Sequence, residues 1–470
     1  MDSGHKSLLD GIRIRLEALP DARTVRRTAA TLFVASCALF LVYIQFPEKL
    51  NFDEFHYIPA ARRLLEFTSP KNLEHPPLGK ELIAIGMAIF GDRPLGWRFM
   101  STIFGALTVT GTYVAGLALF RAQLSALFLA LMTAFNNMTY VQARIAMLDT
   151  FMTGFLVWAF ALGLGAFFPL HPASDPEADR RARLRSLNLS GLAIGLACAS
   201  KWFAIVPWVT LLALAALYPL AGRLTARVAP RKPSKGLPGF FPLPEHGLKF
   251  RDLAVAWVLL PLAAYFITFV PLLVLPDSNG ATPGVLDLLG SLQWQIWDGQ
   301  SRVLSGHPYA STWLQWPLLS RPIWYAFNPT PNGQAVRGVA LIGNPLVLWG
   351  GLVAILWTLR DWLRTRSFAG LWILTAYFSM TLSWAAIPRK ISFFYYYYPS
   401  AILLGFAWTY LLRRASEEPE PEDSPLAPLV LHLGVLAATL ALFIYFWPIL
   451  SAWKLPEGGY RRWMWFRSWI

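Results

Sequence analysis

The segment NFDEFHY, residues Asn51–Tyr57, places two adjacent carboxylates just after an apolar run that covers Thr31–Phe46. We interpret that run as an uncleaved first membrane-spanning helix, because no small-residue cleavage site follows it. Adjacent carboxylates at the edge of a bilayer are costly to keep ionised, since desolvation and mutual repulsion both disfavour the second charge. That cost makes Asp53 and Glu54 candidates for catalysis. The alternative is a solvated loop with two ordinary surface acids.

The composition indicates a polytopic membrane protein. Of 470 residues, 55% are hydrophobic and only 14% are charged, whereas soluble domains carry about 25% charged residues. The 21 tryptophans suit aromatic anchoring at membrane interfaces. The two cysteines, Cys37 and Cys198, lie in separate apolar runs, so we interpret both as small hydrophobic residues rather than a disulfide or a metal site.

Apolar runs predict an all-α fold with about eleven membrane-spanning helices, since a helical span needs about 20 apolar residues. The runs lie near residues 29–46, 96–119, 122–139, 147–169, 187–200, 202–220, 253–274, 338–358, 369–386, 395–412 and 427–449. Lys201 interrupts a nearly continuous apolar stretch between the fifth and sixth runs. A sharp turn there gives two short spans, and one long kinked span is the competing interpretation.

The basic residues predict the orientation of the chain in the membrane. Lys and Arg concentrate at 13–27, 180–185, 223–235 and 360–366, which fall on one side if the count of spans is right. That side, which includes the N-terminus, is expected to be cytoplasmic. The net charge of +14 is then explained by anionic lipid headgroups as partners, with no nucleic acid involved.

The opposite side receives two long loops, 47–95 and 275–337, which we predict to form the active-site face of a single domain covering residues 1–470. The first loop contains amphipathic runs at Tyr57–Phe67 and Leu78–Phe90, separated by prolines that stop one helix and start the next. The C-terminal residues 451–470 are rich in Trp and Arg, and we expect them to lie as an amphipathic segment on the bilayer surface.

Basic residues near the predicted outer ends of the helices are candidate anion ligands, namely Lys80, Arg144, Lys201 and Arg389. Cations at membrane depth face cavities or anions more often than lipid, and a phosphate at the membrane surface is the natural anion. For Lys390 the commoner alternative is snorkelling to headgroups. For Arg144 the alternative is a structural ion pair with Asp149.

Two histidines of the first outer loop, His56 and His75, are candidate metal ligands. No His/Asp set at ligand spacing accompanies them, which favours histidines hydrogen-bonded within the loop. The sequence identifies no cofactor, and it leaves open whether a divalent cation takes part.

Short motifs recur in order along nearly the whole chain. They are FDEFHY at 52–57, HPPLGK at 75–80, RIAMLD at 144–149, SKW at 200–202, YASTWLQWP at 309–317, RPIWY at 321–325, GNP at 343–345 and the Tyr-rich run to Pro399. This order resembles the dolichyl-phosphate-mannose protein O-mannosyltransferase family. The resemblance implies the GT-C fold of integral-membrane glycosyltransferases. It implies a compact prokaryotic member, because loop 275–337 is too short for the β-trefoil MIR domain of eukaryotic members.

The resemblance also implies a reaction. A sugar, mannose, would move from a polyprenyl-phosphate donor to a hydroxyl of a protein or peptide acceptor, with inversion at the anomeric carbon. Asp53 would be the base, with Glu54 orienting a substrate beside it. The leaving phosphate would be stabilised by Arg144, Lys201, Arg389 and Lys80. The expected substrate-positioning residues are His56, His75, Asp149, Trp313, Trp316, Arg321 and Tyr395.

Two alternatives stay open at this point. The same chemistry on a lipid or glycan acceptor keeps the fold and changes the product. A membrane transporter also carries acids and bases within its spans. Against a transporter, the charged residues gather at one outer face, and the sequence shows no inverted repeat. The resemblance places the protein in the bacterial inner membrane, with the active site on the periplasmic face.

Overall fold

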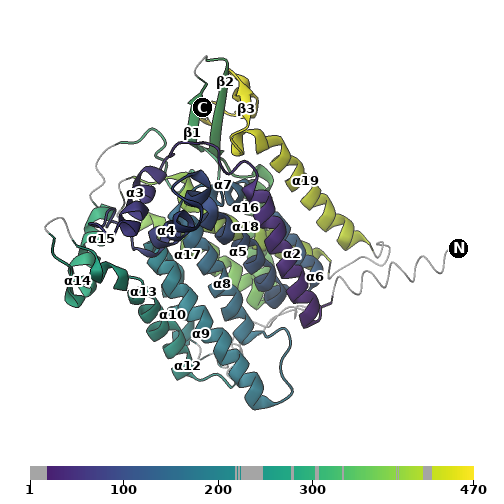
Figure 1. Cartoon of the computed structure of the whole chain (residues 1–470). Coiled ribbons are helices and arrows are strands. Elements are labelled where there is room, and N and C mark those ends of the chain that lie inside the picture. Colours follow the sequence, from purple (N-terminus) through teal and green to yellow (C-terminus); the bar gives the residue numbers. More distant parts are fainter. Residues whose placement is uncertain are drawn as a thin grey trace.

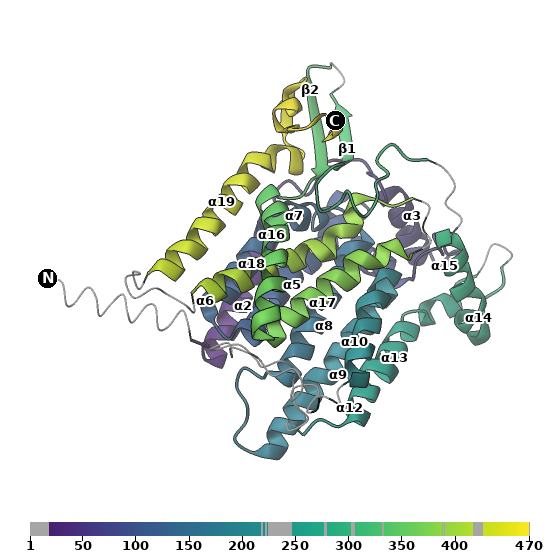
Figure 2. The same ribbon diagram turned by 180° about the vertical axis from the view of Figure 1, so that it is seen from behind.

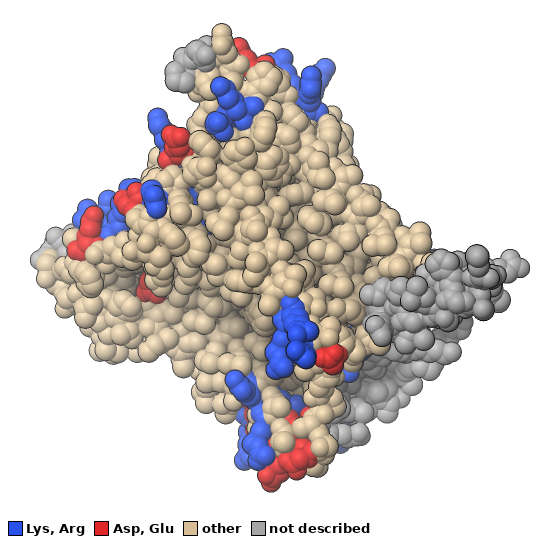
Figure 3. Space-filling view, turned by 45° about the vertical axis from the view of Figure 1, so that its right-hand side comes forward, with Lys and Arg blue, Asp and Glu red and all other residues tan. Residues whose placement is uncertain are grey.

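Long apolar helices form the body of the protein, and a small β-sheet covers one end of it (Figure 1, Figure 2). The computed structural model describes residues 18–217, 220, 223, 247–276, 280–301, 306–330, 333–387, 389, 391–416 and 426–469. On the face in Figure 3, charged side chains gather toward the upper and lower ends and leave a broad uncharged area between them. This distribution is that of an integral membrane protein.

Seven helices within the described ranges are long and apolar enough to cross a membrane. They are Ala22–Leu41 (α2), Pro94–Phe120 (α5), Leu148–Phe167 (α8), Phe250–Val274 (α12, η4, α13 and η5), Leu346–Thr365 (η6 and α16), Phe368–Ala385 (α17 and η7) and Ala427–Leu450 (α19). Shorter or more polar helices fill the other predicted spans: Gln123–Ala134 (α6), Pro176–Ser200 (α9), Ile205–Leu217 (α10) and Tyr398–Ala415 (α18). Every predicted span therefore contains a helix, although the number of membrane crossings stays a prediction.

The break predicted at Lys201 is present. Helix α9 ends at Ser200, and Lys201 has an extended backbone with φ −160° and ψ 133°. A short turn, Trp202–Ala204 (η1), then leads into α10. The chain therefore forms two helices here instead of one kinked helix, and the side chain of Lys201 is presented at the junction.

The two amphipathic helices predicted in the first outer loop are confirmed as Glu54–Leu65 (α3) and Leu78–Phe90 (α4). The second outer loop contributes Val285–Leu289 (α14) and Ser291–Ser301 (α15). Between α6 and α8 a short helix, Asn137–Gln142 (α7), precedes the motif RIAMLD. Another short turn, Phe394–Tyr397 (η8), carries the tyrosine run.

The predicted helical fold is confirmed, and a small three-stranded antiparallel sheet that was not predicted adds to it. Strand Ile323–Pro329 (β1) pairs with Ala335–Leu341 (β2), from Ile323 opposite Leu341 to Pro329 opposite Val336. β2 also pairs with Lys454–Pro456 (β3). The span predicted over 338–358 therefore begins as a strand, and its helix starts only at Leu346. A short, nearly continuous apolar run does not distinguish a buried strand from a helix.

The C-terminal segment, which was expected to lie on the bilayer surface, is folded against the protein at several points. After β3 it forms two short turns, Gly459–Trp463 (η9) and Arg467–Trp469 (η10). The Trp469 side chain is buried, and its indole Nε1 donates to the carbonyl oxygen of Leu319 at 2.6 Å. The tail thus packs against the protein itself, and its contact with the bilayer surface stays a prediction.

Glycines allow α9 to lie directly on the helical segment that contains η4 (Val255–Leu259) and α13 (Leu260–Ile267). A Cβ added at Gly191 would lie 1.7 Å from the carbonyl oxygen of Ala256, and one at Gly195 would lie 2.3 Å from that of Pro261. Small residues that let backbones touch are the usual means of helix association in membranes, where burial of apolar surface does not drive it.

We expect Gly191→Ala to lower the midpoint of thermal unfolding of the purified protein in detergent. The added methyl group overlaps a backbone oxygen, so α9 has to move, and overpacking of this kind costs about 1–3 kcal/mol. Gly434→Ala in α19 is the matched control, because a Cβ there meets no atom within 4 Å. Equal midpoints for the two variants would show that the contact does not hold the helices together.

Candidate active site

Asp53 directs its carboxylate toward two tyrosines. It directly precedes α3, where an aspartate commonly caps the helix, but its side chain makes no capping bond. Instead its Oδ2 accepts hydrogen bonds from the hydroxyl groups of Tyr57 and Tyr395, both at 3.2 Å. The half-buried carboxylate is therefore held by side chains from two distant parts of the chain.

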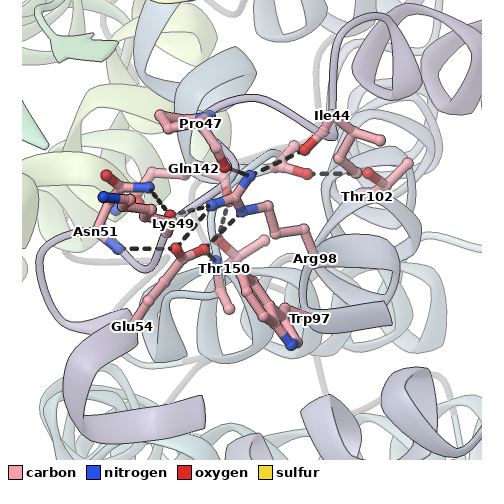
Figure 4. Close-up of polar contacts among 12 residues, drawn as sticks. Ile44, Pro47, Lys49, Asn51, Glu54, Trp97, Arg98, Thr102, Gln142 and Thr150 are labelled. Atoms are coloured by element: carbon pink, nitrogen blue, oxygen red, sulfur yellow. Dashed lines mark hydrogen bonds and ion pairs between the residues drawn. The ribbon is translucent and has the colours of Figure 1, made fainter. Parts of the chain in front are cut away.

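Glu54 points the other way, into the protein, where Arg98 of α5 binds it (Figure 4). The guanidinium Nε and Nη2 donate to the carboxylate at 2.7 and 2.9 Å, and both side chains are fully buried. The backbone N–H groups of Asn51 and Ala146 donate to the same carboxylate, both at 3.1 Å. With both oxygens occupied, Glu54 has no face for a substrate. This geometry argues against its predicted catalytic role.

Arg98 uses all five of its N–H groups. Besides Glu54, it donates to carbonyl oxygens at the end of the first helix and in the loop that follows: Ile44 at 3.0 Å, Pro47 at 2.9 Å and Lys49 at 3.3 Å. Sequence reasoning missed this residue. Its signal was a charged side chain inside the predicted span 96–119, where a cation requires a partner.

Lys201 forms a buried ion pair with Asp149 at the start of α8. Its Nζ lies 2.9 and 2.7 Å from the two carboxylate oxygens. Asp149 therefore pairs with Lys201 and not with Arg144, the alternative partner considered from the sequence. The ammonium also lies 5.0 Å from the ring centre of Tyr395 and 4.8 Å from that of Tyr396. Aromatic faces stabilise a cation that is removed from water.

Arg389 also lies beside the tyrosine run. Its guanidinium is 4.9 Å from the ring centre of Tyr396, and its Nη1 donates to the side-chain oxygen of Gln300 in α15. The side-chain amide of Gln300 donates in turn to the carbonyl oxygen of Glu74 at 2.6 Å. Gln300 thus joins the two outer loops at Arg389. No feature of the sequence predicted Gln300 as a site residue. Lys390, the neighbour of Arg389, lies outside the described residues.

Lys201 and Arg389 line the same cavity, whose volume is about 240 Å³. The wall is otherwise mainly apolar and aromatic, and it comes from η1, α10, α15 and η7 (Ser383–Ala385). Its apolar side chains include Trp202, Phe203, Val206, Ile296, Trp297 and Trp384, and Glu74, His75 and Gln300 also line it. A cavity with two cations and an aromatic wall suits a ligand that combines an anionic group with an apolar chain.

The other two predicted phosphate ligands have backbone partners. The Lys80 ammonium donates to the carbonyl oxygens of Asn72 at 2.5 Å and His75 at 2.8 Å, and burial lowers its pKa to about 7. The Arg144 guanidinium donates to Val42 at 2.6 Å, and to two further helix-terminal carbonyl oxygens, those of Phe40 and Leu450. Carbonyl groups in the last turn of a helix lack intrahelical donors, and Arg144 supplies them for α2 and α19. Neither side chain lines the cavity.

Among the predicted positioning residues, His75 and Tyr395 lie at the site. The His75 ring packs edge-on against Tyr57, with ring centres 5.9 Å apart, and burial lowers the pKa of the imidazole well below its usual range. His56 is exposed on α3. The described residues contain no group of three or more His, Cys, Asp or Glu side chains that could hold a metal ion.

Of the other predicted positioning residues, Trp316 supports the aromatic wall. Trp316 is buried, donates to Ser311 Oγ at 3.0 Å and packs edge-on against Trp384. Arg321 donates twice to the carbonyl oxygen of Pro308, and Trp313 is half-buried. Their contact with an acceptor stays a prediction. Tyr57, Tyr396 and Gln300 were missed as site residues, although Tyr57 belongs to the motif that contains Asp53.

Two descriptions of one protein family match most of the chain. Residues 92–271 match dolichyl-phosphate-mannose-protein mannosyltransferase, and residues 286–469 match the C-terminal four-transmembrane region of protein O-mannosyltransferase. The polyprenol-phosphate-mannose–protein mannosyltransferase of Mycolicibacterium smegmatis is 26% identical over 89% of this chain and 87% of its own length. The enzyme of the same name from Corynebacterium glutamicum is also 26% identical, over 89% and 88%.

Solved structures share the fold. The Pmt1–Pmt2 protein O-mannosyltransferase complex of Saccharomyces cerevisiae, bound to its sugar donor, matches with a TM-score of 0.76 at 14% identity, covering 98% of this chain and 94% of the matched chain. ArnT from Cupriavidus metallidurans, bound to undecaprenyl phosphate, matches with a TM-score of 0.56 at 17% identity, covering 90% and 76%. Together these matches confirm the predicted GT-C architecture.

We expect Arg98→Met to leave the Glu54 carboxylate buried without a counter-charge, which costs about 3–5 kcal/mol and strongly lowers the thermal midpoint. The double variant Arg98→Met/Glu54→Gln removes both charges and keeps an acceptor for the Asn51 and Ala146 N–H groups. Its midpoint should recover most of the loss, as measured by thermal unfolding of the purified variants. A double variant as unstable as the single one would contradict the role given to the ion pair.

Proposed function

The chain belongs to the dolichyl-phosphate-mannose protein mannosyltransferase family, and on this basis we propose that it transfers mannose from a polyprenyl-phosphate donor to a hydroxyl group of a protein. The single observation that supports the mechanism best is the position of Tyr395. Its hydroxyl group binds the carboxylate of Asp53, and its ring lies against the ammonium of Lys201. A proton acceptor and a cation therefore meet at one side chain.

The donor fits the cavity by its chemistry. Lys201 and Arg389 are placed to bind the phosphate, Lys as a point charge and Arg through its planar pair of N–H groups. The apolar wall of η1, α10 and α15 suits the first isoprene units of the chain. Asp149 holds the Lys201 ammonium at the cavity wall and balances its charge until the phosphate arrives.

Asp53 acts as the general base in this proposal. An acceptor hydroxyl gives its proton to the carboxylate while its oxygen attacks the anomeric carbon of mannose. The bond between that carbon and the phosphate oxygen breaks, and the electron pair leaves with the polyprenyl phosphate. Attack and departure take place on opposite faces, so the configuration inverts. Lys201 and Arg389 stabilise the negative charge that develops on the leaving phosphate.

Protein Ser and Thr are the proposed acceptors, since the relatives that cover most of this chain are named for protein mannosylation. A lipid or glycan acceptor is the second possibility within the fold, and a transporter is not favoured by the family match. We propose a single GT-C domain over residues 1–470 in the bacterial inner membrane, with a cytoplasmic N-terminus and a periplasmic active site. The alternation of basic loops supports this orientation.

Transfer itself is the direct test of the proposal. Purified protein in lipid nanodiscs is incubated with polyprenyl-phosphate-mannose and a Ser/Thr-rich peptide, and the mass of the peptide is measured by mass spectrometry. We expect the peptide to gain one hexose per modified site. If a lipid or glycan acceptor is modified and the peptide is not, the acceptor is of the second class and protein mannosylation is excluded. No transfer to any acceptor while the donor binds would refute it.

We expect Asp53→Asn to reduce turnover by about 10²–10⁴-fold, the usual contribution of a general base, while the donor binds with nearly unchanged affinity. An amide cannot take the acceptor proton, but it preserves size and still accepts the two tyrosine hydroxyl groups. Asp92→Asn, which removes a loop carboxylate paired with Arg62, is the matched control. Steady-state transfer and donor titration measure the two effects, and normal turnover in the Asp53→Asn variant would exclude the role.

Lys201 is tested together with its partner, so that no buried charge is left alone. We expect the double variant Lys201→Gln/Asp149→Asn to lose about 1.5–3 kcal/mol of binding free energy for polyprenyl phosphate, the value of a charge-assisted contact. The double variant Arg62→Gln/Asp92→Asn, which neutralises an ion pair outside the cavity, is the matched control and should retain affinity. Isothermal titration with polyprenyl phosphate compares both variants with the wild-type protein, and equal affinities for all three would remove Lys201 from the phosphate site.

A further inference from the structure

The backbone around Asp53 is arranged to free its side chain. Asp53 already has helical angles, φ −67° and ψ −10°, so its carboxylate does not cap the helix that follows. The residue before it, Phe52, has φ +50°, a left-handed conformation that is unfavourable for a bulky side chain. Ring contacts hold Phe52 in this conformation: its ring centre lies 4.9 Å from that of Tyr325 and 5.8 Å from that of Tyr395. Strain of this kind persists only where the surroundings impose it.

Two phenols then bind one oxygen of the freed carboxylate. Tyr57 lies one helical turn after Asp53 in α3, and Tyr395 comes from η8. Both hydroxyl groups donate to Oδ2, at the same distance of 3.2 Å. Within the described residues no donor reaches Oδ1. The two oxygens of Asp53 are therefore not equivalent, and only one of them is open to an incoming hydroxyl group.

The phenol of Tyr57 stays a donor throughout the working pH range. Burial raises its pKa well above its ordinary value, and the nearby charge of Asp53 acts in the same direction. The Tyr57 ring is also fixed, since it packs against His75, which lines the cavity. Tyr57 thus combines a rigid position with a permanent O–H donor.

Several other groups face Asp53 and contribute to its field. Lys201 lies at the junction of α9 and α10, Arg389 between η7 and η8, and Asp149 at the start of α8. The phenols of Tyr396 and Tyr325 complete the surroundings. The two cations attract the negative charge of Asp53, and Asp149 repels it. Since Lys201 is already paired with Asp149, the direct hydrogen bonds to Oδ2 are the contacts specific to Asp53.

We propose that Tyr57 is a positioning residue that, together with Tyr395, fixes Oδ2 of Asp53, stabilises the negative charge of the carboxylate and leaves Oδ1 as the atom that takes the acceptor proton. This proposal rests on the transfer reaction proposed above. Hydrogen bonds to a carboxylate favour its ionised form, so removal of one phenol should make the carboxylate easier to protonate. Proton transfer then takes place at Oδ1, with the phenols still bound to the other oxygen.

The variant Tyr57→Phe removes the hydroxyl group and keeps the ring. The proton affinity of Asp53 should rise, and the acid limb of the pH profile of kcat/KM should move up by about one pH unit. KM for the donor should stay unchanged, because Tyr57 is not among the groups that line the donor cavity. Tyr113→Phe is the matched control. It also removes a buried hydroxyl group, one that donates to Gln123 at 2.8 Å, far from the site in α5.

A second measurement does not depend on transfer. A hydrophobic carbodiimide reacts with protonated carboxyl groups, and mass spectrometry of the peptide that contains Asp53 gives the pH at which labelling is half-maximal. That midpoint should rise in Tyr57→Phe and stay in place in Tyr113→Phe. If the wild-type protein transfers no mannose, the reaction proposal fails and the labelling still decides the role of Tyr57. A labelling midpoint equal to that of wild type, in a folded Tyr57→Phe protein, would overturn the inference.

Discussion

The buried ion pair of Arg98 and Glu54 is the constraint on which the arrangement of the outer face depends. A guanidinium without water needs a partner for each of its N–H groups, and here the carboxylate and three loop carbonyl groups supply them. Because those partners lie after α2 and at the start of α3, one side chain of α5 fixes the path of residues 44–54. The apolar packing of the bundle does not specify that path by itself, since loops gain little from burial of apolar surface.

The ion pair also separates the tasks of two adjacent acids. Successive residues at a helix start point in different directions, so when Glu54 is drawn into the protein, Asp53 is turned outward to the tyrosines. The negative charge of Glu54 is neutralised by Arg98 and lends no repulsion to Asp53. One carboxylate therefore sets the backbone and the other is left for chemistry. Two adjacent carboxylates repel one another, but here Arg98 neutralises Glu54, and two tyrosine hydroxyl groups bind Asp53.

Much of the fold was predictable, because lipid exposure imposes long apolar runs that composition reveals directly. The break at Lys201 was predictable for the same reason, since a lone cation in such a run needs an exit or a partner. The role of Arg144 was not predictable. A helix-terminal carbonyl and a phosphate oxygen both satisfy a guanidinium, and sequence does not show which of the two lies nearby. The β-sheet was missed because the apolar strand β2 has the same composition as the start of a span.

The sequence motifs predicted which residues are candidates for the site, but they did not predict which side chain each of them contacts. Asp149 and Lys201 stand far apart in the chain, and only the packing of α8 on α9 makes them an ion pair. That pair has a consequence for catalysis. A cation that is already held by a carboxylate and two tyrosine rings does not have to be reoriented when a negative charge develops beside it, whereas water would have to reorganise. The aromatic run of η8 is thus the element that brings the base and the cation to one place. Tyr395 of this run binds the Asp53 carboxylate through its hydroxyl group, and its ring centre lies 5.0 Å from the Lys201 ammonium.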